Sequence, residues 1–132
     1  MPDHETVRCM LAAAGRDLQA IANMCDAELF PAEIFGLHAQ QSVEKALKAW
    51  LACRDLEVPR THNLRLLLVL LIQAGEEMTE EWNFVDLTAF AVQFRYEACT
   101  AMDAVLDRQH VVEQVATLLR KVTDICAQTL EE

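Results

Sequence analysis

Turn-forming residues are scarce in this chain, which has three Gly and three Pro among 132 residues. Domains built from many short strands need frequent turns, and Gly and Pro supply most of them, whereas helical domains need far fewer. Apolar residues make up 53% of the chain, which is enough for a packed core, and its length suits one domain. We therefore predict a single all-α domain over residues 1–132.

Apolar side chains recur three and four positions apart along most of the chain, the spacing that places them on one face of an α-helix. The segment after Asn63 is apolar nearly all round, so we expect that helix deep in the core, whereas residues 95–106 fit either a continuing helix or a break. Together the helices predict an up-and-down antiparallel four-helix bundle with an additional short helix. The predicted helices, with their caps, are Asp3 (the cap) to about Glu28, about Ala32 to Cys53, Leu64–Gln73 (Thr61 or Asn63) ended by Ala74-Gly75, Glu80 to about Phe94 (Thr79), and Arg108–Leu130 (Asp107).

Charge is unevenly distributed along the chain. The formal net charge is −10, but residues 44–65 hold five Lys and Arg against three Asp and Glu, a local balance of +2. So acidic a chain is a poor coat for duplex DNA, because affinity for phosphate comes from Lys and Arg. The local basic segment is consistent with a site for a nucleotide, a short RNA or an acidic partner, or with ordinary solvated surface charge.

Several features predict a cytoplasmic protein without a membrane span, a metal or a cofactor. The longest apolar run, residues 66–72, is far shorter than the roughly 20 residues that a span needs. The N-terminus has no apolar signal region, and the four histidines lack a third ligand at recognisable spacing for zinc. The cysteines form no CxxC pair, so we expect buried thiols in a reducing compartment: Cys9, Cys25, Cys53, Cys99 and Cys126.

The second predicted helix carries the segment HAQQSVEKALKAW at residues 38–50, whose polar side chains lie opposite its apolar face. PRTHNLRLL follows at residues 59–67, and FRYEA follows at residues 94–98. In this order and at these distances, the three segments resemble the HEPN domain family.

The resemblance implies a helical bundle that often forms homodimers. Small prokaryotic members are commonly encoded beside a minimal nucleotidyltransferase, and such pairs act as toxin–antitoxin systems in which the HEPN protein is frequently an RNA-cleaving toxin. Other members are proposed to bind nucleotides or to serve as partner domains. Carried over residue by residue, the resemblance implies a polar groove for a nucleotide or RNA, formed by His38, Gln41, Glu44, Lys45, Lys48, Thr61, His62, Arg95 and Tyr96.

In this groove Lys45, Lys48 and Arg95 would engage phosphate, because ammonium and guanidinium groups supply positive charge and hydrogen-bond donors. His62 would transfer protons, and Tyr96 would stack on a base or donate to phosphate.

A structural role for the same side chains is the alternative. Glu44 and Lys48 are spaced to pair on one helix, and Arg95 would pair with Glu44 or another carboxylate inside the bundle. His38 and Gln41 would then line a dimer interface.

The ribonuclease members of the family carry an Arg and a His separated by four to six residues, and no Arg–His pair in this chain has that spacing. Glu97 also stands where many relatives have Pro. We therefore favour a binding or partner module, a homodimer that associates with a nucleotidyltransferase, over an enzyme. The alternatives are a metal-independent RNase toxin that uses His62 with Arg95, and a regulator that binds free nucleotides.

Overall fold

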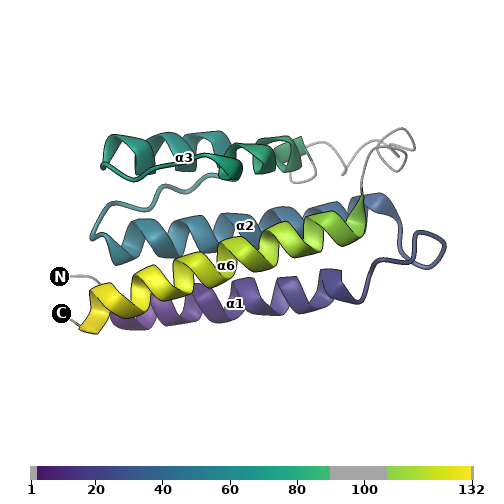
Figure 1. Cartoon of the computed structure of the whole chain (residues 1–132), viewed down its shortest axis with the longest axis horizontal. Helices are drawn as coiled ribbons and strands as arrows, with labels where there is room; N and C mark the ends of the chain where they lie inside the picture. Colours follow the sequence, from purple (N-terminus) through teal and green to yellow (C-terminus); the bar gives the residue numbers. More distant parts are fainter. Residues whose placement is uncertain (1–2, 90–106, 132) are drawn as a thin grey trace.

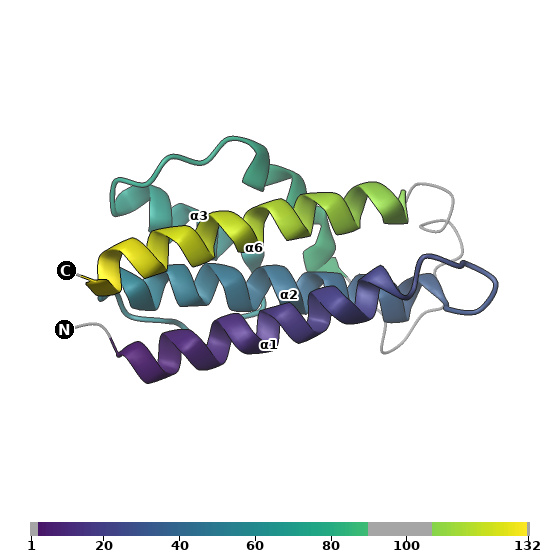
Figure 2. The same ribbon diagram turned by 60° about the horizontal axis from the view of Figure 1, so that its bottom comes forward.

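The computed structural model describes residues 3–89 and 107–131, which form the α-helices α1 (His4–Ala22), α2 (Ala32–Cys53), α3 (Leu64–Gln73) and α6 (Arg108–Glu131) and the 3-10 helix η1 (Glu80–Leu87). These residues contain no strand, so the prediction of an all-α fold is confirmed. The start of α1 and the end of α6 lie at the same end of the bundle, and α1 runs antiparallel to α2 and α6 (Figures 1 and 2). None of the helices described is long and apolar enough to cross a membrane.

α2 is the central helix, because α1, α3, η1 and α6 all pack against it. Its side chains Phe35, Leu47 and Trp50 are almost completely buried, and burial of each large apolar side chain contributes roughly 1.5–3 kcal/mol. Even its polar residues Gln40 and Glu44 are buried. An amphipathic helix with one solvated face is therefore too simple a description of residues 32–53, since neighbours cover α2 on several sides.

The first helix is shorter than predicted, because α1 ends at Ala22 and not near Glu28. Asn23 caps this end, and its side-chain Nδ2 donates to the carbonyl oxygen of Gln19 at 2.9 Å. Asp26 then fixes a turn by accepting from the backbone N–H of Glu28 at 2.9 Å. Leu29 fits the helical spacing but is 72% exposed, so the apolar stripe continues into the connection without reaching the core.

Local signals mark both ends of α3 as predicted. Asn63 caps its start by accepting from the backbone N–H of Leu66 at 3.3 Å, whereas Thr61 does not cap α3. Gly75 follows its end with a φ of 96°, where the backbone N–H of Glu76 reaches the carbonyl oxygen of Leu71 at 3.0 Å. The prediction that α3 lies deep in the core is confirmed for one side of the helix, where Leu64, Leu67, Leu68 and Leu71 are buried. It is wrong for the other side, where Leu66 and Ile72 are 40% and 41% exposed.

The next predicted helix begins at Glu80, but η1 over Glu80–Leu87 is a 3-10 helix. Thr79 was expected to cap it, yet within the described residues its side chain makes no capping hydrogen bond, and its backbone N–H donates instead to Oε1 of Glu81 at 3.3 Å. Residues 90–106, including the ambiguous stretch 95–106, lie outside the described residues. Asp107 caps α6 as predicted, by accepting from the backbone N–H of His110 at 3.1 Å.

The cysteines divide by position. Cys53 on α2 and Cys126 on α6 are buried, and burial together with the neighbouring Cys53 thiol raises the pKa of Cys126 to about 12. Cys9 is exposed and Cys25 is half-buried, so the expectation of buried thiols is wrong for these two. Cys99 lies outside the described residues.

Candidate functional site

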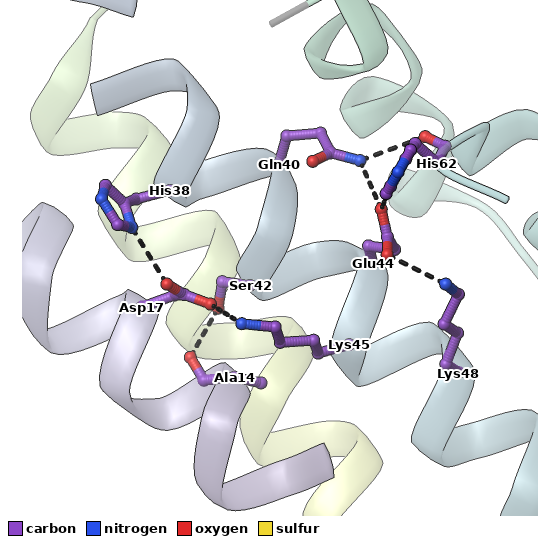
Figure 3. Close-up of polar contacts among 9 residues, drawn as sticks. All are labelled: Ala14, Asp17, His38, Gln40, Ser42, Glu44, Lys45, Lys48 and His62. Carbon is purple, nitrogen blue, oxygen red and sulfur yellow. Dashed lines mark hydrogen bonds and ion pairs between the residues drawn. The ribbon is translucent and has the colours of Figure 1, made fainter. Parts of the chain in front are cut away.

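A buried carboxylate on α2 organises the first group of polar residues. Oε1 of Glu44 accepts from Nε2 of Gln40 at 2.9 Å and lies 2.9 Å from Nδ1 of His62, and Oε2 accepts from Nζ of Lys48 at 2.9 Å (Figure 3). Nε2 of Gln40 also donates to the backbone oxygen of His62 at 3.1 Å. These contacts hold the residues just before α3 against the middle of α2. We call Gln40, Glu44, Lys48 and His62 the Glu44 group.

Glu44 is ionised at neutral pH. Burial by itself would raise its pKa, but the hydrogen bonds from Gln40, His62 and Lys48 outweigh burial and lower the pKa below the ordinary value. Because the carboxylate only accepts hydrogen bonds, Nδ1 of His62 carries the hydrogen between them. The His62 side chain is 67% exposed, so Nε2, at the other edge of the ring, is accessible from solvent.

A second buried carboxylate joins α1 to α2. Oδ2 of Asp17 accepts from Nζ of Lys45 at 2.7 Å, and Oδ1 lies 3.0 Å from Nδ1 of His38 (Figure 3). Next to this carboxylate, Oγ of Ser42 donates to the backbone oxygen of Ala14 at 2.8 Å. We call Asp17, His38 and Lys45 the Asp17 group. Its contacts fix the register of α1 against α2.

The residues of the predicted groove therefore lie in two groups. His38 and Lys45 lie between α1 and α2, whereas Glu44, Lys48 and His62 lie where α2 meets the start of α3. Gln41 is half-buried on α2 and belongs to neither group. Arg95 and Tyr96 lie outside the described residues. The expected pairing of Glu44 with Lys48 on one helix is confirmed.

Two residues central to these groups, Gln40 and Asp17, were not among the sequence candidates. Gln40 precedes Glu44 by four residues, a spacing that permits a hydrogen bond along one helix, so a local signal for it exists. Asp17 has no such signal, because its partners are on another helix.

The two groups differ in the chemistry that they allow. Each motif lysine already faces a buried carboxylate, so a phosphate would have to compete with that pairing for either cation. His62 instead presents an accessible nitrogen on a ring that a carboxylate orients, the arrangement suited to taking or giving a proton. Within residues 3–89 and 107–131, no three His, Cys, Asp or Glu side chains are arranged to hold a metal ion.

The family model for the HEPN domain matches residues 7–129 of the chain. Comparisons with curated proteins and with solved structures found no match. The matched region covers the five described helices apart from the first residues of α1 and the last residues of α6. It contains both polar groups. The all-α bundle, the ordered motifs and this match over most of the chain lead to one conclusion: the chain belongs to the HEPN domain family.

Proposed function

We propose that this HEPN protein is a binding and partner module that forms a homodimer and associates with a nucleotidyltransferase in a toxin–antitoxin type system. A nucleotide or RNA would bind its polar groove only in competition with the internal ion pairs of that groove. The observation that carries the proposal is the internal pairing of the motif lysines. Lys45 and Lys48 lie 2.7 Å and 2.9 Å from carboxylate oxygens of Asp17 and Glu44. A nuclease needs cations free to stabilise charge on phosphate, whereas a partner module needs a rigid bundle.

The proposal is tested by purifying the full tagged chain from its native host and identifying the proteins that come with it by mass spectrometry. We expect a short nucleotidyltransferase, and we expect the two purified proteins to re-form the complex on mixing. Recovery of the folded chain without a nucleotidyltransferase, also after chemical crosslinking, would contradict the partner role.

Ligand binding is tested separately by calorimetry with a panel of nucleotides and short RNAs. Heat of binding that disappears in Lys48→Met would support a nucleotide or RNA site in the Glu44 group. Binding of free mononucleotides alone would favour the regulator. If no heat is seen at millimolar ligand, the ligand part of the proposal fails while the partner part stands.

The geometry of His62 favours a second candidate function, a metal-independent RNase. With Nδ1–H directed at Glu44, the accessible Nε2 is free to accept the proton of a ribose 2′-hydroxyl. The 2′-oxygen then attacks the adjacent phosphorus, the P–O5′ bond breaks to leave a 2′,3′-cyclic phosphate, and the departing 5′-oxygen takes up a proton from water. Arg95 is the candidate for stabilising the charge that develops on that phosphate.

For this candidate we expect growth arrest on overexpression and RNA cleavage that persists in a metal chelator. His62→Ala should abolish both, whereas Arg120→Ala, at an exposed position on α6, should abolish neither. A harmless wild type that leaves RNA intact would exclude this function.

A further inference from the structure

α3 has an outward side that carries four apolar side chains, although no described element covers them. Leu66 and Ile72 are 40% and 41% exposed, and Val69 and Leu70 are half-buried. The side of α3 that packs on the bundle is separate, with Leu64, Leu67, Leu68 and Leu71 buried there. In Figure 1, α3 lies in an outer layer beside α2. A solvated helix face normally carries charged residues, so this face is unusual for a monomer.

A shallow apolar pocket adjoins the C-terminal end of this face. It has a volume of about 250 Å³, and one wall is formed by Leu56 and Glu57 from the connection after α2. Leu56 is itself 36% exposed. The complete lining is Leu51, Leu56, Glu57, Leu70, Gln73 and Ala74. The outward side of α3 thus has an exposed leucine, Leu66, near its N-terminal end and a pocket at its C-terminal end.

The charges around α3 have a polarity that matches this shape. Arg65, near the start of the helix, is exposed, and Glu57, in the pocket at the far end, is also exposed. α3 itself contains no Asp or Glu, which matters in a chain of net charge −10, because two copies meet least repulsion where carboxylates are absent. When a second copy of this surface lies antiparallel to the first, the basic start of each α3 faces the acidic end of the other, which gives two favourable contacts.

We propose that the outward side of α3 is the surface through which two copies of this chain associate, with the two α3 helices antiparallel about a two-fold axis near Val69. Leu66 and Ile72 are each three residues from Val69, so the axis places Leu66 of each copy over the C-terminal end of the partner's α3, at its pocket. Arg65 of each copy then faces the partner's Glu57. A contact of this kind is isologous and closes at two copies. The inference rests on the proposed homodimer and names its interface.

Light scattering coupled to size-exclusion chromatography tests the surface on the full chain. We expect twice the chain mass of 14.9 kDa for the wild type and 14.9 kDa for Leu66→Glu. Leu29→Glu is the matched control, because Leu29 is even more exposed but lies in the connection between α1 and α2, and this variant should remain a dimer. A monomeric wild type, or a dimer that survives Leu66→Glu, would overturn the inference.

Charge reversal tests the antiparallel register with exposed residues whose substitution leaves the core intact. Arg65→Glu and Glu57→Arg should each weaken dimerisation about tenfold or more, and the double variant should restore it, because each pair is reversed as a whole. Loss of the dimer in the double variant would rule out this register. The two proposals can fail separately. If Leu66→Glu is monomeric but a nucleotidyltransferase still copurifies with it, the partner role and the interface both stand. If the wild type is a dimer but no nucleotidyltransferase copurifies with it, the partner role is refuted and the proposed interface stands.

Discussion

Glu44 is the residue on which the polar contacts around α2 converge, and we expect Glu44→Gln to be destabilising. The variant leaves Lys48, whose side chain is 17% exposed, without its carboxylate and places an amide beside donors that need acceptors. Loss of a partner by a buried charged or polar group costs roughly 1–3 kcal/mol. Urea unfolding at pH 7 should show a decrease of that size, whereas Glu113→Gln, at an exposed position on α6, should change little.

The same substitution predicts a pH dependence. The pKa of Glu44 is lower in the folded chain than its ordinary value of 4.5, so its stabilising contribution is complete above about that pH and is lost as pH falls through the folded pKa. The difference in unfolding free energy between wild type and Glu44→Gln should therefore narrow as the pH is lowered from 7 through 4.5 and below. A difference that stays constant would show that Glu44 does not contribute through its charge.

The contacts of this site that lie along one helix could be predicted from the sequence. Gln40, Glu44 and Lys48 are four residues apart, so their contacts follow from helical geometry. The contacts of His62 with Glu44 and of Asp17 with Lys45 could not be predicted, because they depend on how separate segments pack. A helical wheel also places Glu44 on the solvent side, whereas the chain just before α3 in fact covers it.

At the scale of elements, two glycines should respond in opposite directions to replacement by alanine. Gly75 ends α3 at a φ of 96°, which alanine adopts only with strain, so Gly75→Ala should lower stability by about 1 kcal/mol. Gly15 lies inside α1, where an added Cβ would meet only Leu119 at an ordinary 4.0 Å, so Gly15→Ala should raise stability by about 0.5–1 kcal/mol. Thermal unfolding measures both, and two changes of the same sign would contradict this account.

The ends of the helices differ in how well the sequence predicts them. Helix ends made by a local signal, such as Asn63 before α3 and Gly75 after it, were predicted correctly. The end of α1 was not, because apolar spacing continues through Leu29 while the chain has already turned at Asn23. Spacing alone carries no information about which apolar side chains have a core to enter.

At the scale of the whole molecule, one buried arginine on α6 holds the connection between α1 and α2 and the adjoining start of α2, which lie far from it in sequence. Nη1 of Arg108, at the start of α6, donates to the backbone oxygens of Met24 and Phe30, both at 2.8 Å. Its guanidinium lies 5.2 Å from the centre of the Phe35 ring on α2. The connection between α1 and α2 contains few regular hydrogen bonds of its own, so Arg108 supplies donors that this connection would otherwise lack.

Replacement of Arg108 by methionine keeps an apolar stem but removes these donors, so the effect should be concentrated in residues 23–31. We expect Arg108→Met to lower the unfolding free energy by about 2 kcal/mol, because hydrogen bonds from a charged donor are among the stronger ones and these two are partly buried. Hydrogen exchange should speed up at the backbone amides of residues 23–31 while those of α3 stay protected. Arg120→Met, on the exposed side of α6, should leave both regions unchanged. Uniform loss of protection would mean that Arg108 stabilises the bundle as a whole, and unchanged protection in residues 23–31 would mean that the connection holds its shape without it.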